Sequence, residues 1–174
     1  MSPLSPLTDF TRNESKSMRA FLGMLLFLIG LAAVFLWSGI YSVAAVKPHS
    51  DIVIWLLTTA RDKSIAQHSG HIQPPALTDP ALVQTGFQEY HSMCVACHGA
   101  PGQEASEISK GLNPKPPQLT TPAVQARGNV ELFWIIKNGL RMTGMPAFGP
   151  THDDPILWSL VAFLRRLCRN FSLA

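Results

Sequence analysis

The chain has 174 residues, of which 47% are hydrophobic and 14% are charged, and its formal net charge is +3. This length suits one compact domain with an additional segment, and the composition is too apolar for an ordinary soluble domain alone. The small net charge and the lack of a basic run argue against a nucleic-acid partner. Three cysteines, an odd number, argue against a disulfide framework.

An uncharged, apolar block extends from Ala20 to Val46. A bilayer core of about 30 Å requires about 20 helical residues, so this block predicts one transmembrane anchor over residues 20–42. A cleaved signal peptide is the alternative. We favour the anchor because the apolar region of a signal peptide usually extends over only about 7–15 residues.

The basic residues around this block are unequally distributed. Arg12, Lys16 and Arg19 precede it, whereas only Lys47 closely follows it. The positive-inside rule therefore predicts that residues 1–19 form a flexible cytoplasmic tail and that everything after Lys47 lies outside the cytoplasm.

Residues 43–78 are predicted to form a juxtamembrane amphipathic helix and a linker. Ser50 suits the N-cap of a helix that runs to Gln67. Residues 52–57 form an apolar run that is too short to span a bilayer and too apolar to face water. We expect this run to lie at the membrane interface or to pack on a partner. Residues 69–78 contain two adjacent prolines and predict the linker.

Residues 79–174 are predicted to form a small all-α domain, since no segment alternates convincingly as a strand. Asp79 followed by Pro80 suits the start of a helix, and Gly139 is placed to end one. Residues 99–128 are rich in glycine and proline and predict a loop with one helical turn near 105–110. The longer helices are expected over residues 79–93, 130–138 and 154–169.

A Cys-x-x-Cys-His sequence begins at Cys94 and includes Cys97 and His98. Two thiols at this spacing bond to the two vinyl groups of one haem, and the following histidine ligates its iron. A thioredoxin-like redox pair would require a βαβ context, and a zinc site would require a second ligand pair. Cys168, the remaining cysteine, is expected to be a spectator thiol, with a redox or intermolecular role as the alternative. The motif therefore predicts one covalently attached haem c.

Residues 79–170 resemble class I c-type cytochromes. Gly86 and Tyr90 precede Cys94 by eight and four residues, which is the glycine-and-aromatic pattern of that family's first helix. Three further segments resemble, in the family's order, its Pro-x-Leu segment, its methionine-ligand loop and its final helix: Pro117-Gln118-Leu119, residues 144–149 and residues 158–164. Residues 41–61 also resemble a group of bacterial single-span, membrane-anchored cytochromes.

The resemblance implies that Met145 is the distal iron ligand opposite His98. Thioether ligation favours ferrous iron and raises the potential. Pro146 is expected to make the methionine loop rigid. Met142 is the alternative ligand. The other alternative is that both methionines are core residues and neither is a ligand. The remaining histidines are expected at the surface.

The resemblance also implies that the carbonyl of Pro117 accepts a hydrogen bond from His98 and fixes its ring plane. Pro114 and Pro116 are alternatives for this acceptor.

Gly86 is expected where the first and last helices cross, because glycine permits close backbone approach. Trp158 or Leu157 is the expected opposing side chain. Five aromatic residues are expected to line the haem pocket or the core: Tyr90, Phe133, Trp134, Phe148 and Phe163.

The sequence thus predicts a monohaem electron carrier tethered to the bacterial inner membrane, with its haem domain in the periplasm. In the bacterial family that the chain resembles, haem is attached covalently outside the cytoplasm, which agrees with the topology predicted from the basic residues. Redox proteins, including a dehydrogenase or a terminal oxidase complex, are the expected partners, and no enzymatic activity or small-molecule substrate is expected. The alternatives are a fixed subunit of a larger dehydrogenase or oxidase, and a haem peroxidase or gas sensor with an open distal position.

Overall fold

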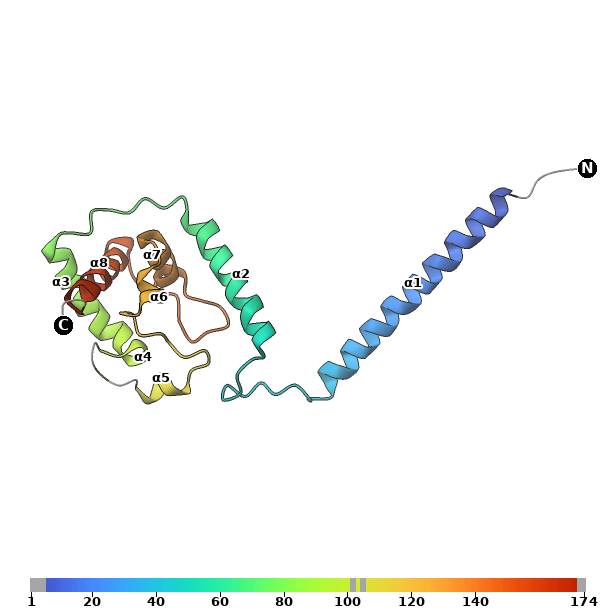
Figure 1. Cartoon of the computed structure of the whole chain (residues 1–174), viewed down its shortest axis with the longest axis horizontal. Coiled ribbons are helices and arrows are strands. Elements are labelled where there is room, and N and C mark those ends of the chain that lie inside the picture. Colours follow the sequence, from blue (N-terminus) through green and yellow to red (C-terminus); the bar gives the residue numbers. More distant parts are fainter. Residues whose placement is uncertain (1–5, 101–102, 104–105, 172–174) are drawn as a thin grey trace, which may run out of the picture. The chain divides into compact units, whose positions relative to one another are not determined.

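The computed structural model describes residues 6–100, 103 and 106–171. The chain divides into two units, Met1–Ala44 and Ala45–Ala174. All the regular structure in the described residues is helical (Figure 1), which confirms the all-α prediction.

The first unit contains one long helix, α1 (Pro6–Trp37). Its segment Lys16–Trp37 is long and apolar enough to cross a membrane, a property that signal sequences share. The helix begins at Pro6, within the segment predicted to be a tail, because a helix nucleated in the apolar block extends at low cost. Gly39, with φ +65°, follows the end of the helix.

The second unit contains α2 and the predicted haem domain. Asp79 directly precedes α3 (Pro80–Glu89) and accepts a hydrogen bond from the Ala81 amide (2.9 Å), so its predicted cap is present. Ser50 precedes α2, but its side chain makes no capping hydrogen bond. Gly139, with φ +66°, ends α7 as expected. The helices of this unit are α2 (Asp51–Ser69), α3 (Pro80–Glu89), η1 (Tyr90–Cys94), α4 (Val95–His98), α5 (Glu107–Gly111), α6 (Pro122–Gln125), α7 (Asn129–Asn138) and α8 (Asp154–Phe171).

Two differences from the predicted elements concern helix ends and short helices. The first helix of the domain does not stop near Met93 but continues through the π-helical turn η1 into α4. A π-turn adds one residue to a helix without breaking it, and here the Val95 amide reaches back to the Tyr90 carbonyl. The short helix α6 was not predicted, although Thr121 followed by Pro122 is a typical helix start.

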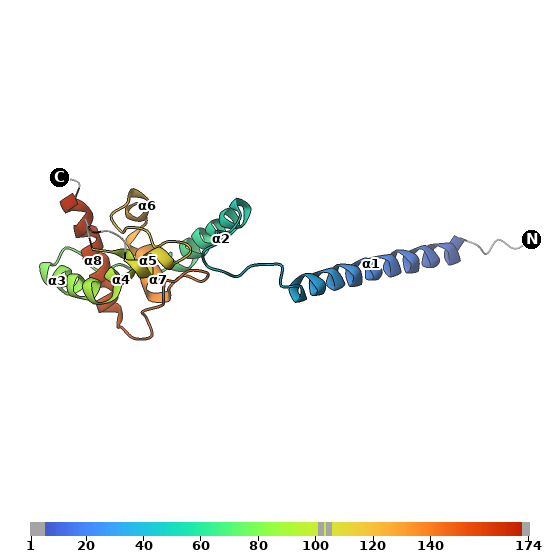
Figure 2. The same cartoon turned by 90° about the horizontal axis from the view of Figure 1, so that it is seen from below.

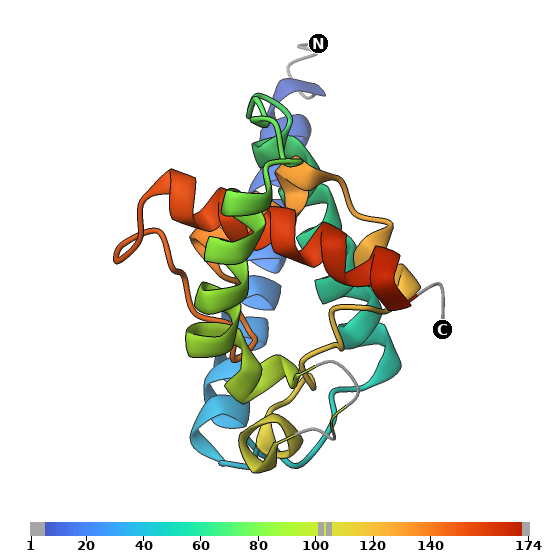
Figure 3. The same cartoon turned by 90° about the vertical axis from the view of Figure 1, so that its left-hand side faces the viewer.

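α3 lies against α8 in each view (Figures 1, 2 and 3), and Gly86 lies at their contact. A Cβ atom on Gly86 would lie 1.9 Å from the Ser159 carbonyl oxygen and 2.9 Å from Phe163 Cβ. The predicted crossing is therefore present, but the expectation that Trp158 or Leu157 opposes Gly86 is wrong. The opposing group is the backbone of Ser159.

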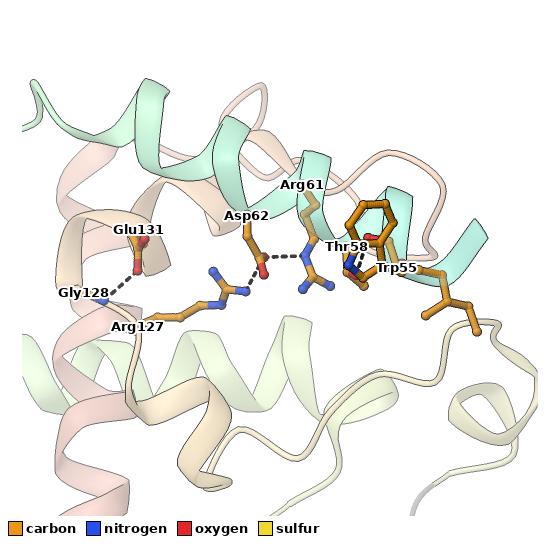
Figure 4. Close-up of polar contacts among 8 residues, drawn as sticks. Trp55, Thr58, Arg61, Asp62, Arg127, Gly128 and Glu131 are labelled. Carbon is orange, nitrogen blue, oxygen red and sulfur yellow. Dashed lines mark hydrogen bonds and ion pairs between the residues drawn. The ribbon is translucent and has the colours of Figure 1, made fainter. Parts of the chain in front are cut away.

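α2 is divided into two parts by its contacts. Its C-terminal part packs on α7, with Ile65 and Ser69 almost fully buried. Asp62 forms an ion pair with Arg127 (2.7 Å), which precedes α7 (Figure 4). The N-terminal part, residues 52–56, is exposed.

Candidate haem site

The Cys-x-x-Cys-His sequence lies on η1 and α4. Because the helix is continuous through this region, one helix carries Cys94, Cys97 and His98. All three residues are half-buried. Burial, with a smaller contribution from Cys97, raises the pKa of the Cys94 thiol to about 12. Gly99, with φ +75°, ends the helix directly after His98.

His98 is oriented by the backbone of the loop that precedes α6. Its Nδ1 atom lies 2.8 Å from the Pro117 carbonyl oxygen. A carbonyl oxygen only accepts, so Nδ1 donates and Nε2 keeps its lone pair when the ring is neutral. Burial lowers the pKa of His98, and the Pro117 hydrogen bond opposes this shift. The imidazole therefore offers one nitrogen in the form that a metal ligand requires.

Among the three candidate prolines, the structure places Pro117 at this hydrogen bond. The imidazole and its acceptor are brought together across a separation of 19 residues. Such an acceptor fixes the tautomer and the ring plane of a ligating histidine.

The segment after α7 holds Met145 in a short hydrogen-bonded loop. The Met145 amide donates to Thr143 Oγ1 (3.1 Å), and the Thr143 hydroxyl donates to the Leu140 carbonyl (2.7 Å). The Leu140 amide in turn donates to the Met145 carbonyl (3.3 Å). These bonds hold the backbone of Met145 and do not involve its thioether.

The end of α7 closes this loop. The Phe148 amide donates to the Ile136 carbonyl (3.2 Å), and the Gly149 amide donates to the Lys137 carbonyl (2.9 Å). A Cβ atom on Gly139 would lie only 2.7 Å from backbone atoms of the loop. The positive φ and the close approach at Gly139 together require glycine there.

The two candidate methionines differ in environment. Met142 has φ +61° and an exposed fraction of 68%. Met145 is half-buried and packs against the hydrophobic core, as Cys94 does. The structure therefore brings Met145, and not Met142, to the same core as the cysteine motif.

Tyr90 connects the first helix with the end of the motif. Its hydroxyl donates to the Gly99 carbonyl (2.7 Å), and burial is the main reason that its pKa is raised to about 12. Its ring lies 5.2 Å from that of Phe163. Tyr90 therefore forms part of the core and stays protonated at neutral pH.

The other aromatic residues divide between the core and α2. Phe133 stacks on Trp158 at 4.1 Å, and Phe148 packs against the same core. Trp134 is half-buried and lies 5.9 Å from the ring of His68, which belongs to α2. Trp134 was expected to line the haem pocket or the core, whereas the structure places it in contact with α2.

Ser106 was not predicted to take part in the site. Its hydroxyl donates to the carbonyl of Ala96, inside the cysteine motif, and accepts from the Ser109 amide at the start of α5 (3.1 Å). A serine followed by Glu107 is a typical N-cap sequence. That local signal predicts the cap, whereas the bond to Ala96 depends on the path of the chain.

The donor set fits a covalently attached haem. Cys94 and Cys97 supply two thiols, His98 supplies a neutral imidazole, and Met145 supplies a thioether on the same core. These are the groups with which a protein binds haem c with histidine and methionine as axial ligands. This fold and this donor set are consistent with a class I c-type cytochrome domain.

Comparison with known proteins agrees with this class. Residues 81–164 match the family model described as cytochrome c oxidase, cbb3-type, subunit III. This part of the chain is a cytochrome c domain with haem c as its cofactor, which supports a role in electron transfer.

Two similar proteins give the wider context. The chain is 29% identical over 135 residues to a quinohemoprotein alcohol dehydrogenase of Comamonas testosteroni, a match that covers 74% of this chain and 18% of that enzyme. The chain therefore spans about a fifth of the relative's length. A reducing HAO-like protein complex of Kuenenia stuttgartiensis matches with a TM-score of 0.48 and 22% identity, over 55% of this chain and 47% of that one.

Proposed function

We propose that this chain is a monohaem electron carrier held at the bacterial inner membrane by α1, with the cytochrome domain in the periplasm. The apolar segment Lys16–Trp37 supports the anchor, and Arg12, Lys16 and Arg19, which precede its uncharged part, support the orientation. Electrons pass between redox proteins of the respiratory chain or the periplasm. Tethering raises the concentration of the domain near membrane-bound partners.

In this proposal, Cys94 and Cys97 attach the haem, and His98 and Met145 are the axial ligands. The bound haem supplies a centre that gains and loses one electron. Pro117 keeps the imidazole in one tautomer and one ring plane. The loop around Met145 holds the thioether, and Met145 and Cys94 pack against the hydrophobic core. The single observation that carries the proposal is the 2.8 Å bond between His98 and Pro117, which leaves one imidazole nitrogen for a ligand bond.

The axial ligand is tested by comparing Met145→Ala with Met142→Ala in the haem-loaded, full-length protein. Met145→Ala should abolish the weak sulfur-to-iron charge-transfer band of the ferric form and allow the ferrous form to bind CO. Met142→Ala should leave both properties unchanged, because Met142 is exposed. Loss of the band in the Met142 variant alone would contradict the assignment.

The anchor is tested on membranes from cells that express the haem-loaded chain. The protein should stay in the membrane after alkaline carbonate extraction. A protease added to spheroplasts should digest the cytochrome domain, whereas inverted membrane vesicles should protect it. Release by carbonate would contradict the anchor, and digestion in inverted vesicles alone would contradict the orientation.

A second candidate function is a fixed electron-transfer subunit of a larger redox enzyme. The observation that favours it is the match to a dehydrogenase of which this chain covers only 18%, together with a family description that names an oxidase subunit. Solubilisation in mild detergent followed by size determination separates the two candidates. A particle that contains further subunits would support the fixed subunit, and a single haem-containing chain would support the carrier.

A further inference from the structure

Five consecutive large hydrophobic residues occupy the first turns of α2 and are exposed. The exposed fraction is 77% for Ile52 and 66% for Trp55, and the lowest value is 37%, for Val53. A contiguous apolar surface of this kind on a folded domain usually marks an interaction site. We call residues 52–56 the apolar tip.

The apolar tip belongs to a helix that is held firmly on the cytochrome domain. One turn or two beyond the tip, Asp62 accepts hydrogen bonds from Arg61 (2.8 Å) and Arg127 (2.7 Å), as Figure 4 shows. Further along, Ile65 and Ser69 are 1% and 2% exposed. The tip therefore has a defined orientation relative to the domain.

A contact on the other side of the tip supports this orientation. Asn113 Nδ2 donates to the carbonyl of Lys47 (3.0 Å), which lies just before α2. The helix is thus held both before and after residues 52–56. A surface that binds the tip would also orient the cytochrome domain.

The distribution of the apolar side chains favours lipid as the occupant. Successive helical residues are about 100° apart, so five in a row point to all sides of the axis. A protein groove receives a helix along one face, at positions spaced by three and four, whereas the interfacial region of a bilayer surrounds an inserted helix end. Trp55 is also a residue type that is enriched in this region.

The length and character of the preceding chain also favour lipid. α1 ends at Trp37 and α2 begins at Asp51. Residues 38–50 extend over at most about 45 Å, at about 3.5 Å per residue, so an anchor in the bilayer keeps the tip near the same surface. Large apolar side chains within this connection are exposed as well, with values of 79% for Ile40 and 88% for Val46.

We infer that the apolar tip inserts into the interfacial region of the bilayer that holds α1 and thereby fixes the orientation of the cytochrome domain. This inference rests on the proposed membrane anchor. The insertion is shallow, because the first backbone amides of a helix need water or headgroup oxygens as partners.

The test places the photo-crosslinking residue p-benzoylphenylalanine in the haem-loaded, full-length chain, in isolated inner membranes. One variant is Trp55→p-benzoylphenylalanine, and Ile52 provides a second position in the tip. Lys63 provides the control, because it is an exposed residue of the same helix and lies about two turns beyond Trp55. We expect lipid adducts from both tip positions, with a yield severalfold higher than from position 63. The haem spectrum of each variant establishes that the domain is intact.

The other outcomes overturn the inference. Adducts from the tip to another protein or to a second copy of the chain would replace lipid as the occupant. Equal lipid yields from positions 55 and 63 would contradict a defined orientation, and the absence of adducts from the tip would contradict insertion. Carbonate extraction of the same membranes separates the two proposals. Release of the chain contradicts the anchor, whereas retention without lipid adducts at the tip contradicts the insertion alone.

Discussion

Replacing Gly86 with alanine tests the contact between α3 and α8 on which the cytochrome domain is built. The new Cβ atom would lie 1.9 Å from the carbonyl oxygen of Ser159 and 2.5 Å from its carbonyl carbon. Both atoms belong to backbone inside α8 and have no rotamer through which to move away. The added Cβ atom would be closer to the Ser159 backbone than van der Waals contact allows. The two helices must therefore separate by on the order of 1 Å or more.

The expected loss of stability follows from two opposing effects. Inserting a methyl group into a packed core typically costs about 1–3 kcal/mol, and a clash with backbone belongs at the upper end of that range. Alanine is favoured over glycine by about 1 kcal/mol inside a helix. The free energy of unfolding should therefore fall by about 2 kcal/mol, which is roughly a 30-fold change in the unfolding equilibrium.

Unfolding of the haem-loaded chain in guanidinium chloride and detergent, followed by the haem spectrum, measures this change for the cytochrome domain. Gly111→Ala is the matched control, because Gly111 lies in α5 and an added Cβ would meet no atom within 4 Å. The control should be neutral or slightly stabilising. If Gly86→Ala were as stable as Gly111→Ala, the close crossing of α3 and α8 would be refuted.

Two further predictions concern the supports of α2 and of the motif. Hydrogen bonds from Arg61 and then Arg127 hold the pKa of Asp62 below its usual value, against the effect of burial. Its contribution to stability is therefore present above the unfolded pKa of about 3.9 and is lost as the pH falls through the folded pKa. Asp62→Asn should lower the free energy of unfolding by at most about 1 kcal/mol at neutral pH. Denaturation measured across a pH series should show that the difference from the unchanged protein vanishes in acid. A difference that stays constant with pH would contradict the ion pair. Ser106→Ala should lower the free energy of unfolding by about 1 kcal/mol through loss of the cap and by about 1 kcal/mol through loss of the bond to Ala96. Ser106→Thr keeps the hydroxyl and should retain most of both contributions. Equal denaturation midpoints for the two variants would refute these roles.

The sequence by itself was sufficient for the parts of the site that lie within one helical segment. Cys94, Cys97 and His98 are joined by the spacing of a single motif, so no distant contact is needed to recognise what they bind. Helix ends marked by local chemistry, such as Asp79 and Gly139, were also predictable, because a cap or a positive φ is a property of a few adjacent residues.

The tertiary structure decided between neighbouring residues that the sequence left as alternatives. Pro117 and not Pro116 faces His98, because the path of the loop and not its composition directs each carbonyl. Ser159 and not Trp158 opposes Gly86, because each residue turns the helix by about 100° and only packing sets the rotation of α8. Apolar pattern alone likewise left open whether α2 packs on the domain or lies apart from it, since burial of a helix depends on the surface that its partner provides.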